Sequence, residues 1–302
     1  MFDNIIGNDE NKKSLTNIVE NNNFLHSYIF SGEVGVGKFT LAKEFAKAIL
    51  CSNTENKPCN RCKSCESFES SNNPDIIIID EQEDVIRTEQ IKSVAKSVLE
   101  KPILGNKKIY IVNNAENMTK EAQNSFLKTL EEPPEYVIII LITSNENLLL
   151  NTIKSRCIRI QFNKLSDNEI KEYFIKNSIE LDEEMIKAFG GSIAKALKLK
   201  DKTEIYKDIK ETFDNIEHLN ELQMLGLKDK IFSDKEEIYY ILDYINTIFY
   251  DKILNDLGNT EKYEECISTI EKTKLSLKRN SNYDMTIDNL LFGLERSLKS
   301  NG

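Results

Sequence analysis

The chain has 302 residues and a formal net charge of −10, with 40% hydrophobic and 30% charged residues. This length allows two or three domains, and this composition can build ordinary hydrophobic cores. The acidic balance argues against unaided binding to a nucleic-acid backbone, which requires a basic face. No apolar run approaches the ~18 residues of a membrane span, and no secretion signal is visible at the start. We therefore expect a cytoplasmic protein with no membrane partner.

The first strand candidate leads into a glycine-rich loop. Tyr28 to Phe30 reads as a buried strand, and the loop after it contains Gly32, Gly35 and Gly37, followed by Lys38 at the start of a helix. The N–H groups of such a loop and of the helix N-terminus hold phosphate oxygens, and the lysine adds a point charge. Strand, loop, lysine and helix together predict a site for the phosphates of ATP or ADP.

The residues that should complete this site are replaced. Phe39 follows the lysine in place of a Ser or Thr whose hydroxyl would bind Mg²⁺. Thr40 cannot substitute, because the next residue on a helix points about 100° away. A strand expected over 109–112 ends in Asn113 and Asn114, where an ATPase places an Asp for Mg²⁺ and a Glu that positions water. Amides serve neither purpose well, so we expect a degenerate site, and the sequence leaves open whether nucleotide binds.

Four cysteines lie within fifteen positions, at Cys51, Cys59, Cys62 and Cys65. In a cytosolic chain this spacing predicts a zinc site. Because no His lies nearby and a catalytic zinc usually keeps an open position, we interpret the zinc as structural. The alternatives are unpaired buried thiols and a disulfide, and a reducing compartment disfavours the disulfide.

Strands and helices alternate through the first half of the chain. Further strands are expected at 76–79, 136–142 and 158–162, and the continuous apolar run at 76–79 predicts burial on both faces. A helix is expected over 87–100, with Leu99 among its inward residues. Such alternation predicts right-handed βαβ units and a parallel sheet. Thr143 and Asn145 follow the strand at 136–142, where ligands bind in open α/β sheets, so we include them in the candidate nucleotide site.

Beyond residue 164 the pattern becomes helical throughout. Short helices are expected at 167–176, 182–189 and 192–199, and longer amphipathic helices follow, such as 236–254. No motif for chemistry appears in this part, which favours a packing or oligomerisation module. The predicted fold class is therefore α/β plus all-α.

Arginine accounts for only six of the 40 basic residues, at positions 61, 87, 156, 159, 279 and 296. A chain that uses lysine by default is expected to keep arginine where a planar fork is needed. This observation draws attention to Arg156, within Ser155-Arg156-Cys157.

The order of these motifs resembles the bacterial clamp-loader subunits of DNA polymerase III, which are AAA+ proteins. The resemblance rests on the phosphate loop, the four-cysteine insertion and three further motifs: Asn-Asn-Ala-Glu-Asn-Met-Thr at 113–119, Leu-Glu-Glu-Pro-Pro at 130–134, and Ser-Arg-Cys at 155–157. It covers roughly residues 1–200, and the helical tail resembles the collar domain of the family. The resemblance implies an AAA+ domain over 1–164 with a zinc insertion at 51–65, a helical lid domain over 165–202 and a helical collar domain over 203–302.

Two branches of the family fit, the ATP-hydrolysing motor subunits (gamma/tau) and the delta-prime subunits, which are usually deficient in ATP turnover. This chain departs from the motor pattern at Phe39, Asn113 and Asn114, and it has Ala194 where a motor carries a lid-domain arginine. The adjacent Lys195 cannot bind a phosphate in the bidentate manner of an arginine. The resemblance therefore implies a delta-prime-type subunit that does not hydrolyse ATP alone but supplies an arginine finger, Arg156, to a neighbouring motor.

The resemblance also implies the partners, which are the gamma/tau motor subunits and the delta subunit. The sliding clamp and primer-template DNA are reached through the assembled complex. Two alternatives remain: an active motor ATPase of the same complex, with another Mg²⁺ ligand, and a zinc-stabilised helical adaptor unrelated to replication. For Arg156 the alternative is an intramolecular salt bridge, to Glu116 or to Glu131.

Overall fold

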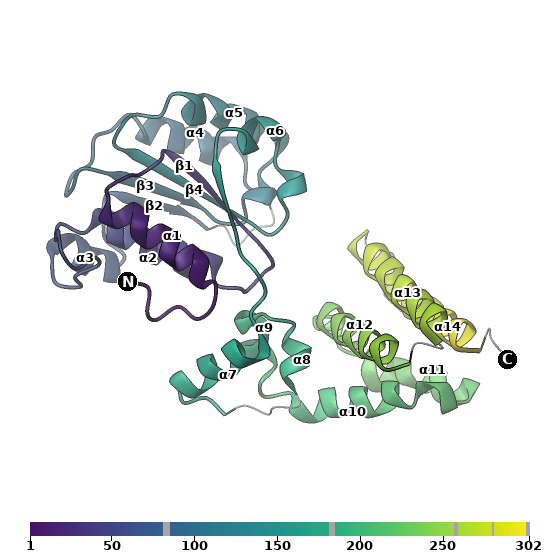
Figure 1. The fold of residues 1–302 in the computed structure, drawn as a ribbon. Helices are drawn as coiled ribbons and strands as arrows, with labels where there is room; N and C mark the ends of the chain where they lie inside the picture. The colour runs from purple at the N-terminus through teal and green to yellow at the C-terminus, as the bar shows by residue number, and fades with distance from the viewer. Residues whose placement is uncertain (81–84, 181–184, 257–258, 280, 300–302) are drawn as a thin grey trace. The chain divides into compact units, whose positions relative to one another are not determined.

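The computed structural model describes residues 1–80, 85–180, 185–256, 259–279 and 281–299 (Figure 1). Two compact units make up the chain: residues 1–173 with 192–194, and residues 174–191 with 195–302. In the described ranges, no helix has the length and apolar character needed to cross a membrane.

A five-stranded parallel sheet lies at the centre of the first unit, in the order β2-β3-β4-β1-β5. The strands are β1 (Ser27–Ser31), β2 (Ile76–Ile79), β3 (Lys108–Val112), β4 (Val137–Thr143) and β5 (Ile158–Gln161). All neighbouring strands pair in parallel, so the parallel sheet predicted from the alternation is confirmed. Every residue of β1, β3 and β4 is buried, as expected for central strands with both faces covered.

β2 corrects one expectation from the sequence. Its four isoleucines predicted burial on both faces, but β2 is an edge strand and Ile78 is 40% exposed. An apolar run indicates a strand that packs against a core, but the degree of burial also depends on whether the strand has neighbours on both sides in the sheet.

Helices cover both faces of the sheet (Figure 1). The helical segments before β5 are, in chain order, α1 (Asp9–Glu20), α2 (Lys38–Leu50), α3 (Lys63–Glu69), α4 (Thr88–Ser97), η1 (Ala115–Asn117), α5 (Lys120–Glu131), η2 (Glu146–Leu148) and α6 (Asn151–Lys154); α7 (Asp167–Lys176) follows β5. Because side chains alternate along a strand, Tyr28 and Phe30 join a core with α1 and α2, whereas Ile29 joins a second core with α4 and α5. The phosphate-loop strand is thus held from both sides.

The end of α4 corrects a second expectation. Leu99 was expected to point inward, but α4 ends at Ser97 and Leu99 is 75% exposed. Helical spacing no longer sets side-chain direction once the helix has ended.

The second unit is helical, as predicted. Its elements are α8 (Ile186–Phe189), α9 (Ile193–Leu199), α10 (Thr203–Asp214), η4 (Ile216–His218), α11 (Glu221–Ile231), α12 (Ile238–Asn255), α13 (Thr260–Lys278) and α14 (Tyr283–Lys299). Aromatic pairs fill its core; Phe249 meets Phe213 and Tyr263 with ring centroids 6.1 Å apart in each pair. The first part of the helix expected at 182–189 lies outside the described residues.

Candidate functional site

The phosphate loop connects β1 to α2, and its lysine is bound by the loop itself. Lys38 is buried, and its Nζ donates hydrogen bonds to the carbonyl oxygens of Gly32 (2.6 Å) and Glu33 (2.5 Å). Burial lowers the pKa of Lys38, and the carboxylates of Glu116 and Glu33 act against that shift. A phosphate at this loop would have to replace the contacts between the lysine and the two carbonyls.

The loop needs glycine because another segment packs directly on it. Gly35 has φ +81°, and a Cβ placed there would lie 2.1 Å from Ser192 Oγ and 2.8 Å from Ala194 Cβ. The N–H of Ile193 donates to the Gly35 carbonyl oxygen at 3.1 Å. Gly37, at φ +90°, then caps the start of α2. The methyl group of Ala194 therefore borders the loop.

The two residues after Lys38 provide no hydroxyl at the loop. Phe39 packs against the core on the α1 and α2 side of the sheet, and Lys43 Nζ lies 5.3 Å from the centroid of its ring. Thr40 is exposed on α2. The side chain that would supply the Mg²⁺ hydroxyl is thus used for packing instead.

The amides at the end of β3 are placed by their neighbours. Asn113 Nδ2 donates to Asp80 Oδ1 at 2.8 Å, which ties the ends of β3 and β2 together. Asn114 is exposed and takes a left-handed conformation with φ +49° at the start of η1. Both side chains end up at the carboxyl edge of the sheet, but Asn113 is engaged with the edge strand.

Glu116 is a site residue that the sequence analysis did not assign to the nucleotide site. Its Oε1 accepts hydrogen bonds from the backbone N–H of Ser144 (2.9 Å) and from the Ser144 hydroxyl. Its Oε2 is buried and meets no hydrogen-bond donor in the described part of the chain. Because Glu116 is the sole carboxylate among residues 113–119, its charge was the available signal in the sequence. It brings a negative charge to the side of the site that faces Lys38.

Thr143 and Asn145 form a local turn around Ser144. Thr143 Oγ1 accepts from the N–H of Asn145 at 3.1 Å, and Asn145 Oδ1 accepts from the N–H of Asn147 at 3.1 Å, which caps η2. The turn presents Ser144 to Glu116 and thereby joins the ends of β4 and β3.

Arg156 follows α6 and is held at the surface by three acceptors. Its Nη2 lies 2.6 Å from Glu131 Oε1, and its Nη1 donates to the carbonyl oxygen of Thr152 (2.8 Å) and to Ser155 Oγ (3.4 Å). The side chain is 33% exposed, and that of Glu131 is 47% exposed. Of the two intramolecular partners considered from the sequence, the structure thus contains the pair with Glu131.

Strand register places Arg156 at the edge of the sheet opposite the phosphate loop. Ile158 pairs with Tyr28 near the start of β1, whereas the loop begins after Ser31 at its end. Three residue steps of a strand already separate these edges by about 10 Å. Arg156 precedes Ile158, so it lies still farther from its own loop.

The four predicted zinc ligands come together in the segment between α2 and α3. The sulfur atoms of Cys51, Cys59, Cys62 and Cys65 all lie within 4.8 Å of one another. A tetrahedral zinc with four thiolates requires sulfur separations of about 3.8 Å. The backbone N–H of Cys59 donates to Cys51 Sγ at 3.3 Å, and that of Cys65 donates to Cys62 Sγ at 3.5 Å. The donor set and its spacing fit a structural zinc ion.

Local contacts divide the four thiols into two kinds. Burial opposes ionisation of Cys62, but hydrogen bonds from Ser52 and from the backbone outweigh it and lower its pKa to about 5. Burial raises the pKa of Cys51 and of Cys65. Hydrogen bonds, first that from the Arg61 backbone, lower the pKa of Cys59. Local contacts thus favour ionisation of Cys62 and Cys59, and a metal ion would supply the charge that favours ionisation of the other two thiols.

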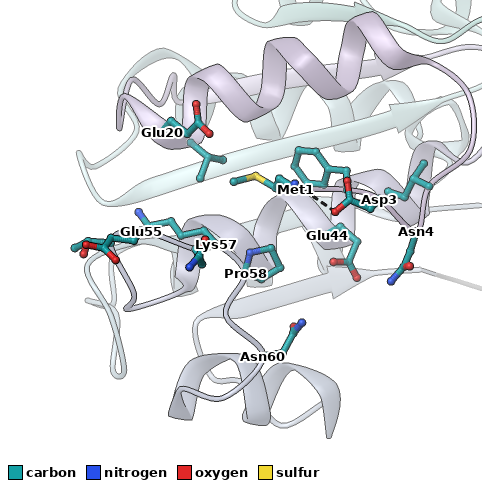
Figure 2. A pocket seen from close by; sticks show the side chains of 14 residues that line it. Met1, Asp3, Asn4, Glu20, Glu44, Glu55, Lys57, Pro58 and Asn60 are labelled. Carbon is teal, nitrogen blue, oxygen red and sulfur yellow. Dashed lines mark ion pairs between the residues drawn. The ribbon is translucent and has the colours of Figure 1, made fainter.

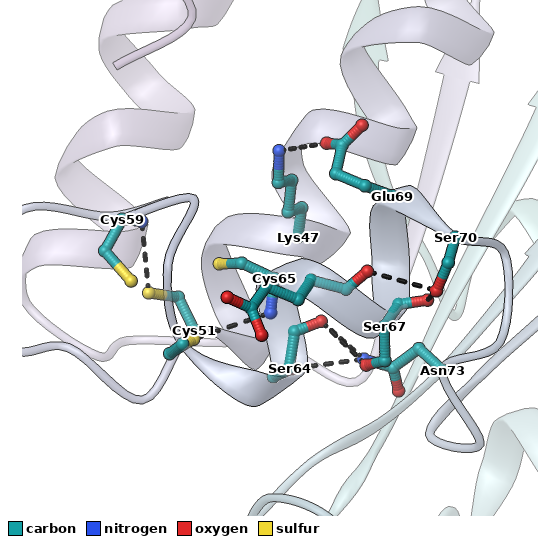
Figure 3. A network of polar contacts seen from close by, with 11 residues as sticks. Lys47, Cys51, Cys59, Ser64, Cys65, Ser67, Glu69, Ser70 and Asn73 are labelled. Carbon is teal, nitrogen blue, oxygen red and sulfur yellow. Dashed lines mark hydrogen bonds and ion pairs between the residues drawn. The ribbon is translucent and has the colours of Figure 1, made fainter.

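Polar contacts fasten the cysteine segment to the helices beside it (Figure 3). Lys47 of α2 forms an ion pair with Glu69 of α3, and Asn73 Nδ2 donates to the Ser64 carbonyl oxygen at 2.9 Å. Residues 54–58 and Asn60 also line, with residues 1–5, a cavity of about 360 Å³ (Figure 2).

Comparison with known proteins decides the family. A family model described as DNA polymerase III, delta subunit, matches residues 7–166, which is more than half of the chain. The chain belongs to the DNA polymerase III clamp-loader subunit family. The resemblance drawn from the sequence motifs is thereby confirmed at the level of the family.

Relatives in both branches of the clamp-loader family match this chain. It is 28% identical to DNA polymerase III subunit delta' of Bacillus subtilis over 278 residues, which is 89% of this chain and 84% of that protein. It is 31% identical to subunit tau/gamma of Haemophilus influenzae over 241 residues, which is 77% of this chain. The chain spans only about a third (34%) of that tau/gamma protein.

A gamma subunit-related protein of Thermotoga maritima shares the fold. Its TM-score is 0.52 at 19% identity, with 94% of this chain and 99% of that chain covered. This likeness confirms the predicted fold class, in which an α/β domain is followed by helices. The clamp-loader family thus accounts for the phosphate-loop sheet and for the helical unit together.

Proposed function

We propose that this chain is a delta-prime-type subunit of a DNA polymerase III clamp loader, which hydrolyses no ATP itself and lends Arg156 to a neighbouring motor subunit. The observation that carries the proposal is the place of Arg156 before β5, at the sheet edge opposite the phosphate loop. From that edge a guanidinium can serve a nucleotide bound by another subunit, but not one bound at its own Lys38.

The state of the chain's own phosphate loop supports the first half of the proposal. Lys38 donates to two loop carbonyls, Phe39 packs against the core and Asn113 is bound to Asp80. Mg²⁺ would thus meet neither the usual hydroxyl nor the usual carboxylate. A site in this condition is expected to turn over little or no ATP, and nucleotide binding there would be weak.

The chemistry proposed for Arg156 is electrostatic. In phosphoryl transfer an arginine supplied by a neighbouring protein stabilises the negative charge of the transferring γ-phosphoryl group, with rate effects of roughly 10³–10⁵-fold. The pair with Glu131 is no obstacle, because a surface ion pair contributes only about 0–1 kcal/mol. Arg156 also keeps further N–H donors with which it can bind a phosphate when a motor subunit docks.

The remaining parts of the proposal follow from the family. The partners are the gamma/tau motor subunits and the delta subunit, with the sliding clamp and primer-template DNA reached through the assembled complex in the cytoplasm. We retain the division into an AAA+ domain (1–164), a lid domain (165–202) and a collar domain (203–302). Zinc held by the four cysteine thiolates would stabilise the first of these and take no part in catalysis.

The deciding experiment uses the complex reconstituted with the motor and delta subunits. Arg156→Ala should leave the mass of the complex unchanged in native mass spectrometry, and it should lower the ATPase rate stimulated by clamp and primed DNA. Arg156→Lys should rescue poorly, because an ammonium keeps the charge but loses the bidentate fork. An alanine complex that assembles, hydrolyses ATP and loads clamps at the wild-type rate would refute the trans role.

One observation favours a second candidate, an active motor ATPase. The carboxylate of Glu116 lies at the carboxyl edge of the sheet, where its charge acts on Lys38, and one of its oxygens is free of donors in the described ranges. If Glu116 held Mg²⁺, the purified chain would hydrolyse ATP at a motor-like rate, and Glu116→Gln would abolish that activity. Under the main proposal the purified chain shows no such turnover.

A further inference from the structure

We propose that Glu131 is a positioning residue for Arg156: its carboxylate holds the guanidinium in the orientation in which the motor subunit's γ-phosphate meets it. This inference rests on the proposed trans role of Arg156 and assigns a function to the carboxylate beside it. Glu131 touches no nucleotide in this role, and its effect passes through Arg156.

The contacts of Arg156 fix both terminal nitrogens of the guanidinium. Glu131, at the end of α5, accepts a hydrogen bond from Nη2 through its Oε1 at 2.6 Å. The carbonyl oxygen of Thr152 on α6 accepts a hydrogen bond from Nη1 at 2.8 Å. Partners on two elements fix the plane of the guanidinium group, whereas a single partner would leave the group free to rotate. Thr152 and Ser155 lie within four residues of Arg156 along the chain, whereas Glu131 comes from a different helix.

Stability of α5 does not explain a carboxylate at this place. Glu131 is the last residue of α5, where the partial negative charge of the helix C-terminus disfavours an acid. Glu132 and two prolines follow at once, so the helix end is already set by the chain. An ion pair that is one-third to one-half exposed also contributes little to folding. The feature that Glu131 does determine is where Arg156 points.

Fixing the Arg156 side chain before the motor subunit docks lowers the entropy cost of binding the γ-phosphate. A free arginine side chain loses much rotamer entropy when it engages a phosphate, and a side chain that is already fixed loses less. A guanidinium has more N–H donors than the three acceptors around Arg156 use within the described chain, so donors remain for phosphate oxygens. Glu131 and Arg156 also share the amino-terminal edge of the sheet, where the partner's nucleotide is proposed to dock.

The test measures steady-state ATPase of the reconstituted complex with clamp and primed DNA. Glu131→Ala should lower kcat by about 10-fold with KM for ATP unchanged, because misplacing a catalytic group costs rate without weakening ground-state binding. Glu131→Gln, which keeps an oxygen acceptor without the charge, should restore much of the rate. Glu132→Ala is the matched control: it removes an exposed carboxylate from the same helix end and should behave as wild type.

The double variant and the assembly controls separate this inference from the proposed function. Glu131→Ala combined with Arg156→Ala should be no slower than Arg156→Ala alone, because Glu131 acts through the arginine. If Arg156→Ala slows the complex while both Glu131 variants match wild type, Glu131 is a surface ion-pair partner only and the proposed function survives. A faster Glu131→Ala complex would likewise overturn positioning. If Arg156→Ala itself has no effect, both proposals fall.

Discussion

Lys38 Nζ lies 2.6 Å from the carbonyl oxygen of Gly32, so the cation of the phosphate loop is bound by the backbone of that same loop. The Glu33 carbonyl is a second acceptor, and residues 192–194 pack against Gly35 from outside. The glycines that shape the loop are present, and the lysine's N–H groups donate to carbonyl oxygens of the loop itself. This arrangement makes nucleotide binding the first property to measure.

The isolated chain is expected to bind MgATP weakly. Restoring the missing Mg²⁺ ligands with Phe39→Thr and Asn113→Asp together should tighten binding by about tenfold or more, since hydroxyl and carboxylate oxygens are the ligands this cation prefers. Turnover should stay absent, because Asn114 still cannot activate water. Equilibrium titration with and without Mg²⁺ reports both results. Tight, Mg²⁺-dependent binding by the wild-type chain would contradict the degenerate site.

The sheet could be predicted because its determinants are local. Continuous apolar runs, the glycine loop and the helical spacing between them all lie within short windows, and each strand was found within a residue or two. Ile78 and Leu99 were misjudged because exposure depends on information outside the window. For Ile78 that information was the missing neighbour strand, and for Leu99 it was the true end of α4.

The contacts of the candidate site could be predicted only in part. The cysteine spacing sufficed to bring the four sulfur atoms together, since short loops join them. The pairs Asn113 with Asp80 and Glu116 with Ser144 join residues about 30 positions apart, which meet because parallel strands end at one edge. Sequence patterns give the edge but not the register, so they could not show which polar side chains would meet.

Protein purified without chelator is expected to contain about one zinc per chain. Cys62→Ser should abolish the bound metal and lower the thermal midpoint of the sheet unit by several degrees, because α3 and residues 54–60 lose their anchor. Cys157→Ser is the control, since that thiol lies outside the cluster and should leave the metal content unchanged. Zinc-free protein of undiminished thermal stability would refute a structural metal.

Asp75 is expected to be a large contributor to the stability of the sheet unit. Its buried carboxylate accepts the backbone N–H groups of Ile103 (2.5 Å), Leu104 (2.7 Å) and Gly105 (3.0 Å). Asp75→Ala would leave these donors unpaired and should cost about 2–4 kcal/mol. Urea unfolding and amide hydrogen exchange at 103–105 measure the loss. Asp80→Ala, at an exposed aspartate, should cost about 1 kcal/mol or less, and equal effects of the two changes would contradict this account.

The helical unit is expected to lose stability in acid partly through Glu217 of η4. Its Oε2 lies 2.8 Å from Lys262 Nζ and its Oε1 accepts the Tyr263 hydroxyl at 2.6 Å, both on α13. Burial opposes ionisation, but these two hydrogen bonds and the lysine charges outweigh it, so the pKa of Glu217 falls below its ordinary value of 4.5. The folded state then binds fewer protons than the unfolded state as the pH drops. The stabilisation is therefore complete above about pH 4.5 and is lost as the pH falls through the folded pKa.

Glu217→Gln should make that dependence visible. At pH 7 the variant should be less stable than wild type, by about 1 kcal/mol for the screened ion pair and more if the buried Lys262 is left without a counter-charge. As the pH falls through the lowered pKa of Glu217, the wild-type carboxylate takes up a proton, so the two urea midpoints should draw closer between pH 7 and pH 3. Glu264→Gln is the matched control, because that exposed carboxylate lies on α13 beside Tyr263 and should give the same small difference at both pH values. A Glu217→Gln deficit that stays constant from pH 7 to pH 3 would show that the carboxylate's charge does not hold η4 to α13.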